Sequence, residues 1–212
     1  MTSNDVTEEI RVNMHRYYQR EVLDGTPGQR VINKNCHLIN KLSYLLGIFP
    51  DAKVIHIIRD CEQVVASWLA MMDSHPTVMA YLPRDERFPC IWFLEKPVDT
   101  AISATFSRHP DFYPGIGEDI FVDLWVKANL GVLEQMNDCQ TQLLQVRYEE
   151  LVRNPAGILA KINQFCELPD FDYSVMHIKS DTALRHKSRI SDQLRKLIEA
   201  RAGPARHRFG FN

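Results

Sequence analysis

The run from Phe49 to Trp68, FPDAKVIHIIRDCEQVVASW, limits the fold more than any other part of this 212-residue chain. Its first half, Ala52 to Ile58, is short, mostly apolar and rich in β-branched residues, which is typical of a strand buried in a parallel sheet. After Arg59 and Asp60, apolar residues recur at helical spacing from Cys61 to Met72, so a helix is predicted there. A strand that leads directly into a helix indicates an α/β protein.

The junction of these two elements has the features of an anion site. Asp60 is predicted to cap the helix, with Gln63 completing a capping box. Arg59 then lies at the carboxyl edge of the sheet beside a helix N-terminus, where open α/β folds bind ligands and where anions are favoured. Ser67 adds a hydroxyl from the second turn of the helix. The alternative is that Arg59 pairs with a local carboxylate and that Ser67 is an ordinary helix position.

Another strand is expected before this one. Arg30 to Asn33 is a short strand candidate, and Leu38 to Leu46 is predicted to be a helix, with Gly47 as its left-handed C-terminal residue. Lys34 and His37 fall between these two elements. A strand–helix–strand unit implies a right-handed crossover, and hence a parallel sheet flanked by helices.

The rest of the chain, 1–212, is expected to complete a single domain. Helices are predicted over 5–23, 118–136 and 190–201 and after Asn154-Pro155, a strand over 143–148, and a frayed basic terminus over 203–212. Residues 73–117 carry six prolines among several aromatic residues. This stretch is predicted to be an irregular substrate-side excursion with short helices, which either caps a site or packs on the surface.

The composition argues against several classes of function. The net charge of −2 gives no general attraction to nucleic acid. No run of about 18 apolar residues is present, so no membrane span is expected. The five cysteines are scattered, without a CxxC or a His/Cys cluster, which argues against a metal site such as structural zinc. Reduced thiols and a polar, acidic N-terminus favour a cytoplasmic location.

Two blocks of the sequence resemble the PAPS-dependent sulfotransferases, where PAPS is 3′-phosphoadenylyl sulfate, and are most similar to the branch that includes the tyrosylprotein sulfotransferases. The first block is NKNCHLINKLSYLLGIFPDAKVIHIIRD, followed by Ser67. The second is VRYEELVRNP, Val146 to Pro155, followed by a helix with Phe165. The order and spacing of the blocks fit the family, and the resemblance covers residues 30–70 and 118–170.

The resemblance implies a P-loop NTPase-like sulfotransferase fold and a set of site residues. Arg59 and Ser67 match the pair that holds the 3′-phosphate of PAPS, and Tyr148 matches the position whose ring lies near the adenine. Lys34 matches a lysine that steadies the sulfonate and the bridging oxygen of the leaving phosphate. Each residue also has a plain structural explanation, with Tyr148 as a core tyrosine at a strand end and Lys34 as a solvated loop lysine.

His37 is the candidate catalytic base, because the ordinary pKa of histidine suits proton transfer. The cytosolic branch of the family carries a base histidine two residues after the equivalent lysine, whereas the offset from Lys34 to His37 is three. The tyrosylprotein branch instead uses an acidic base from upstream of the point where this chain begins. His37 could also simply occupy the first turn of the Leu38 helix.

One feature of the family, an RSGTT-type loop that cradles the 5′-phosphosulfate, is not found in the sequence. The residues before Arg30 hold Gly25 and Gly28 without a strand–loop–helix unit, and Pro27 removes a donor. The simpler explanation is an N-terminally incomplete fold. The other is a shortened relative that does not transfer sulfonate alone.

The resemblance therefore implies a sulfotransferase-like domain that moves a sulfonate from PAPS, without a metal, to a hydroxyl or amine. The acceptor is a small molecule, a carbohydrate or a peptide. The alternative is a non-catalytic nucleotide-binding or interaction module derived from the same fold. A kinase-like nucleotide enzyme is disfavoured because the chain has no GxxxxGK[ST] loop.

Overall fold

The structure, a computed structural model, describes residues 2–24, 30–74, 79–81, 92–94, 118–175, 178 and 190–211. For His37 and residues 71–74, 79–81, 92–94 and 118–120 it describes the backbone alone. Most of the excursion predicted at 73–117 lies outside the described residues. Internal contacts divide the chain into two compact units, here called unit 1 (Met1–Val54 with Gly131–Leu144) and unit 2 (Ile55–Leu130 with Gln145–Asn212). The single domain over 1–212 stays a prediction.

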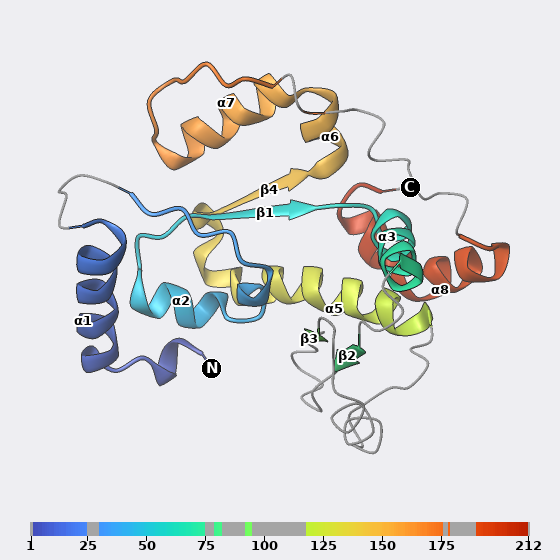
Figure 1. Cartoon of the computed structure of the whole chain (residues 1–212), viewed down its shortest axis with the longest axis horizontal. Coiled ribbons are helices and arrows are strands. Elements are labelled where there is room, and N and C mark those ends of the chain that lie inside the picture. Colours follow the sequence, from blue (N-terminus) through green and yellow to red (C-terminus); the bar gives the residue numbers. More distant parts are fainter. Residues whose placement is uncertain are drawn as a thin grey trace. The chain divides into compact units, whose positions relative to one another are not determined.

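Helices make up most of the described structure (Figure 1). They are α1 (Glu8–Tyr17), α2 (Leu42–Ile48), α3 (Cys61–Ser74), α5 (Glu118–Gln135), α6 (Tyr148–Arg153), α7 (Pro155–Cys166) and α8 (Asp192–Arg208). Short 3-10 turns cover Ser3–Asp5, Cys36–Leu38 and Asn137–Gln142, and Tyr18–Val22 is a π-helical turn. The strands are β1 (Val54–Ile58), β2 (Met79–Tyr81), β3 (Trp92–Leu94) and β4 (Leu143–Arg147).

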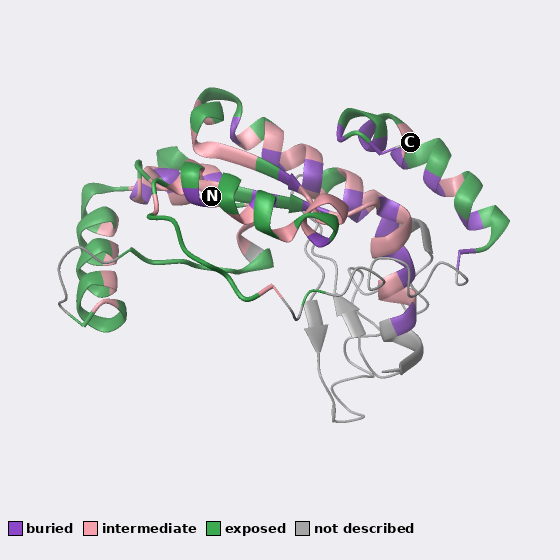
Figure 2. Ribbon diagram, turned by 90° about the horizontal axis from the view of Figure 1, so that it is seen from above, coloured by how far each residue is buried: buried purple, intermediate pink, exposed green. Residues whose placement is uncertain are grey.

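Strand β1 pairs with β4 in a parallel sheet flanked by helices, which confirms the predicted α/β class (Figure 1). Strands β2 and β3 form a separate antiparallel pair. His56 and Ile58 on one face of β1 are buried, whereas Ile55 and Ile57 on the other face are 37% and 51% exposed. The prediction of a buried strand thus holds for one face only (Figure 2).

In unit 1, α2 packs on the last turn of α5. The buried cluster comprises Leu42, Leu46, Val132 and Met136. The amide of Gln135 joins the two helices, since its Oε1 accepts from the Leu42 backbone N–H at 2.8 Å and its Nε2 donates to the Ile39 carbonyl at 2.9 Å. These bonds satisfy backbone groups at the start of α2 that have no partner within the helix.

Three predictions in unit 1 are wrong. Arg30–Asn33 is not a strand, because residues 30–35 form neither helix nor strand, and Ile32 is 87% exposed, so burial does not stabilise an extended ladder. The helix expected from Leu38 begins at Leu42, after the 3-10 turn Cys36–Leu38. Gly47 lies inside α2 and not in the left-handed region, and a Cβ there would lie 2.8 Å from Val6 Cγ2. Gly47 therefore allows a close approach of the N-terminal segment.

In unit 2, α8 packs against α3, and it is longer than predicted. The helix continues through Pro204 to Arg208, and the following Phe209 and Phe211 are buried. Both rings contact the edge or face of Trp125, at centroid distances of 6.1 and 6.5 Å. The prediction of a frayed terminus over 203–212 is thus wrong for the described residues 203–211. The buried stripe that holds the helix consists of Leu194, Ile198, Ala202 and Ala205.

Candidate functional site

The turn between β1 and α3 is organised by Asp60. Its Oδ1 accepts from the backbone N–H of Glu62 at 3.0 Å, as expected of a residue that caps α3. Gln63 does not complete a capping box, which corrects the prediction. Its Oε1 accepts instead from Arg59 Nε at 3.0 Å, because a guanidinium is a stronger, charge-assisted donor.

Arg59 is half-buried and held by residues from α3, α5 and α6. Besides the Gln63 bond, its guanidinium carbon lies 4.9 Å from the centroid of the Tyr148 ring, a cation–π contact. Its backbone carbonyl accepts from Trp125 Nε1–H at 2.8 Å. The partner described for its Nε is thus the side-chain amide of Gln63. These contacts fix both the backbone and the plane of the guanidinium.

The start of α6 meets this turn through two neighbouring side chains. Tyr148, predicted at the end of a strand, is the first residue of α6 and places its ring against Arg59. Glu149 accepts from the backbone N–H of Asp60 at 3.0 Å through Oε1. The two sequence blocks therefore meet here, and the structure brings Arg59 and Tyr148 together.

Ser67 is half-buried in α3. It follows Gln63 by four residues, so the two side chains lie on the same face of the helix. Because Gln63 contacts Arg59, Ser67 lies one turn further along the face that carries the arginine's partner.

Lys34 and His37 belong to unit 1, whereas the Arg59 group belongs to unit 2. Lys34 is exposed in the segment 30–35 that forms neither helix nor strand. His37 lies in the 3-10 turn Cys36–Leu38, which precedes α2. Their catalytic roles stay predictions.

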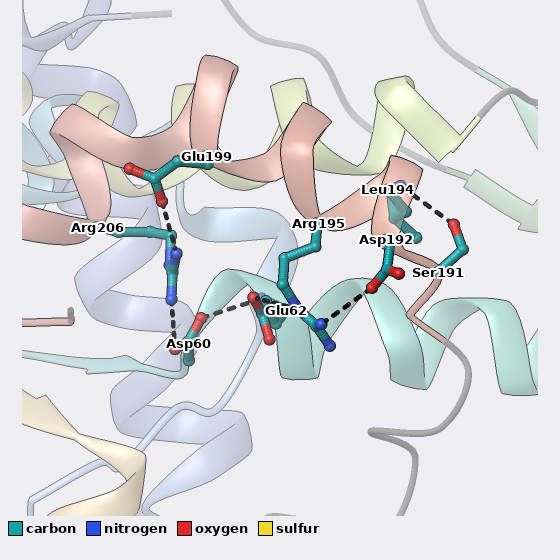
Figure 3. A network of polar contacts seen from close by, with 8 residues as sticks. All are labelled: Asp60, Glu62, Ser191, Asp192, Leu194, Arg195, Glu199 and Arg206. Atoms are coloured by element: carbon teal, nitrogen blue, oxygen red, sulfur yellow. Dashed lines mark hydrogen bonds and ion pairs between the residues drawn. The ribbon is translucent and has the colours of Figure 1, made fainter.

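Arg206 is a functional candidate that the sequence interpretation missed. Although it is only 8% exposed, its Nη2 lies 3.2 Å from Asp60 Oδ2 and its Nη1 lies 3.2 Å from Glu199 Oε2 (Figure 3). Burial disfavours its charge, but the carboxylates of Asp60, Glu62 and Glu199 more than offset this and raise the pKa of Arg206. Recognising the apolar stripe of α8 beyond Pro204 would have revealed that this residue lies on a packed helix.

Two buried titratable groups close to the turn in sequence, Cys61 and His56, are unsuited to nucleophilic or acid–base catalysis. Burial, with the neighbouring Asp60 charge, raises the pKa of the Cys61 thiol to about 12, which leaves it protonated and weakly nucleophilic. Burial lowers the pKa of His56 to about 4, partly opposed by its hydrogen bond to Asn129. The neutral imidazole donates from Nε2 to Asn129 Oδ1 at 3.0 Å, so it serves as a structural donor within unit 2.

Two features are absent from the described part of the chain. Within it, no group of three or more His, Cys, Asp or Glu side chains is arranged to hold a metal ion. In the same residues, no helix is both long and apolar enough to cross a membrane.

Comparisons with known proteins point in one direction. Residues 1–88 match the model of the sulfotransferase family. Protein-tyrosine sulfotransferase A of Caenorhabditis elegans is 26% identical over 199 residues, which are 91% of this chain and 43% of that protein. Omega-hydroxy-beta-dihydromenaquinone-9 sulfotransferase Stf3 of Mycobacterium tuberculosis is 24% identical over 86% of this chain and 41% of its own length. The chain thus spans less than half the length of the curated relatives it matches.

Proposed function

We propose that this chain is a sulfotransferase-like domain that binds PAPS and takes part in transferring its sulfonate to an acceptor, which its similarity to the sulfotransferase family model and to curated sulfotransferases supports. The observation that carries the proposal is the arrangement of Arg59 at the carboxyl end of β1. Gln63 and Tyr148 fix its guanidinium beside the N-terminus of α3. A preorganised guanidinium at that edge of a sheet is suited to binding a phosphate.

The donors of the turn fit the 3′-phosphate of the proposed cofactor. Arg59 would supply charge-assisted hydrogen bonds, and Ser67 a hydroxyl from the next turn of α3. Tyr148, which already orients Arg59, would lie near the adenine. When bound, PAPS supplies the sulfonate that is transferred.

In unit 1, two residues would act on the reaction. Lys34 would place a cation near the charge that grows in the transition state, which accelerates transfer more than it strengthens ground-state binding. His37 would accept the proton of the acceptor group. The names of the relatives specify a protein tyrosine and an omega-hydroxy compound, which favours a hydroxyl acceptor over an amine. A cytoplasmic location stays a prediction.

Calorimetry with adenosine 3′,5′-bisphosphate tests the proposed cofactor site. We expect the wild-type chain to bind it and Arg59→Ala to bind it about a hundredfold more weakly, because a charged hydrogen-bond pair is lost. Arg153→Ala is the matched control, since Arg153 is an exposed arginine at the end of α6. No binding by the wild type, or equal binding by the two variants, would overturn the cofactor assignment.

Sulfonate transfer from labelled PAPS then separates the enzyme from its alternative. Transfer to a phenol or alcohol supports the enzyme. Tight binding of the nucleotide without transfer to any hydroxyl or amine acceptor would instead favour the non-catalytic nucleotide-binding module.

A further inference from the structure

We propose that Arg206 is a positioning residue for the phosphate-binding turn: it neutralises Asp60 and so allows a phosphate to bind at Arg59 next to a carboxylate. The inference rests on the proposed function of that turn. It assigns a role to the C-terminal helix α8, which the two sequence blocks do not include.

The geometry places Arg206 at the residue that organises the turn. Asp60 caps α3 with Oδ1 and accepts from Arg206 on Oδ2 at 3.2 Å (Figure 3). Its backbone N–H donates to Glu149. The side chains of Arg206 and Asp60 are only 9% and 18% exposed. Since water screens a pair this buried only weakly, the guanidinium acts on the electrostatics of the turn as well as on its shape.

The charges around the turn explain why a counter-charge is needed there. The carboxylates of Asp60, Glu62 and Glu149 all lie on or contact the segment that follows Arg59. A phosphate bound at Arg59 adds further negative charge in the same place. Arg206 neutralises Asp60, and Arg195 lies 3.5 Å from Glu62. Without Arg206, the Asp60 charge would repel the phosphate directly.

The packing of α8 separates this electrostatic role from a purely structural one. The helix is held by its buried stripe, which includes Leu194 and Ile198, and by Phe209 beyond its end. The second partner of Arg206, Glu199, has a side chain that is 72% exposed, so water screens its interaction with the guanidinium. Arg206→Met therefore keeps the apolar stem of the side chain against its neighbours and removes the charge.

The experiment measures the affinities of the 212-residue chain for adenosine 3′,5′-bisphosphate and for adenosine 5′-monophosphate. Arg206→Met is expected to weaken binding of the bisphosphate about tenfold and that of the monophosphate less than about twofold, because only the bisphosphate places a group at Arg59. Arg201→Met is the matched control. It removes one positive charge from the same helix, where Arg201 pairs with Asp123 at 2.8 Å on the surface, and it should change neither affinity.

A second substitution makes the result specific to the charge of Asp60. Asp60→Asn retains an oxygen that caps α3 but carries no charge. The double variant Asp60→Asn/Arg206→Met should bind the bisphosphate within about threefold of the wild type, because the repulsion is gone. Asp60→Asn alone should bind it at least as tightly as the wild type, a result that does not require Arg206→Met to fold.

Three results would overturn the inference. These are equal losses for both nucleotides in Arg206→Met, no rescue in the double variant, and weaker bisphosphate binding by Asp60→Asn alone. Failure of the proposed function looks different, because the wild type itself would then not bind the bisphosphate more tightly than the monophosphate.

Discussion

The turn that follows β1 and the segment 30–35 both carry predicted site residues, yet they are built very differently. Arg59 is fixed through Gln63, Tyr148 and Trp125, and the adjacent Asp60 through Glu149 of α6 and Arg206 of α8. Lys34, in contrast, is exposed in a segment that forms neither helix nor strand. The groups suited to hold a phosphate are thus preorganised, whereas the cation expected to act on the sulfonate is not. Nucleotide binding and transfer should therefore be separable by mutation.

The largest expected effect comes from the exposed segment. Lys34→Ala should lower the rate of sulfonate transfer about a hundredfold, as the removal of one donor to a transition-state charge does, while nucleotide affinity changes less than about twofold. Lys41→Ala, at another exposed lysine of unit 1, is the control. Transfer assays and calorimetry on the same samples check this. If Lys34→Ala lowered nucleotide affinity as much as it lowered the transfer rate, the segment 30–35 and the turn after β1 would not have separate roles.

Acid should lower the stability of the region around β1, which contains the buried His56, more than that of α1. The pKa of His56 is depressed to about 4 from 6.5, so the unfolded chain binds more protons and stability falls as the pH drops below about 6.5. We expect a loss of about 2 kcal/mol in the free energy of unfolding between about pH 7 and pH 4.5. His56→Gln, which retains a donor for Asn129, should remove most of this dependence.

Urea unfolding at a series of pH values measures that loss, and amide hydrogen exchange of β1 compared with α1 locates it. The exposed His207 on α8 provides the control substitution, His207→Gln. An unchanged pH dependence in His56→Gln would show that other groups control the acid sensitivity.

A smaller effect should distinguish two half-buried serines. Ser67→Ala should weaken binding of adenosine 3′,5′-bisphosphate about tenfold, the value of one hydrogen bond to a charged group. Ser43→Ala, in α2 of unit 1, should not change it. Calorimetry of both variants makes the comparison, and indistinguishable affinities would remove Ser67 from the proposed site.

The smallest effect concerns the ring beneath Arg59. Tyr148→Phe retains the cation–π contact and should bind the nucleotide like the wild type, whereas Tyr148→Leu should bind it about threefold more weakly. If Tyr148→Phe is the weaker of the two, the hydroxyl and not the ring face contributes to the site.

The sequence predicted those parts of the fold whose signals are local and apolar. β1, α3, α5 and β4 have strong periodic patterns, and α7 begins with Pro155 after the cap Asn154, whose Oδ1 accepts from Gly157 N–H at 3.2 Å. These helices and strands are encoded by residues close together in the chain, and their sequence patterns can be recognised without knowledge of the tertiary structure. The family resemblance assigned Arg59 and Tyr148 to the same cofactor, but their direct contact was not predicted.

What the sequence did not predict depends on distant contacts. A proline and several basic residues made 203–212 look like a free end, but burial of Ala205, Phe209 and Phe211 outweighs the loss of one backbone donor. Gln63 fits a capping box by spacing, and only the position of Arg59 shows the competing donor. Arg206 was missed because its partner Asp60 lies 146 residues earlier.

That separation in sequence also bears on how the protein is synthesised. Asp60 leaves the ribosome long before Arg206 is made, by on the order of 10 s at ordinary elongation rates. Throughout that interval β1 and α3 are available to fold, but the carboxylate between them has no counter-charge from α8. The nascent chain therefore acquires the full set of contacts at Asp60 only after α8 has been translated.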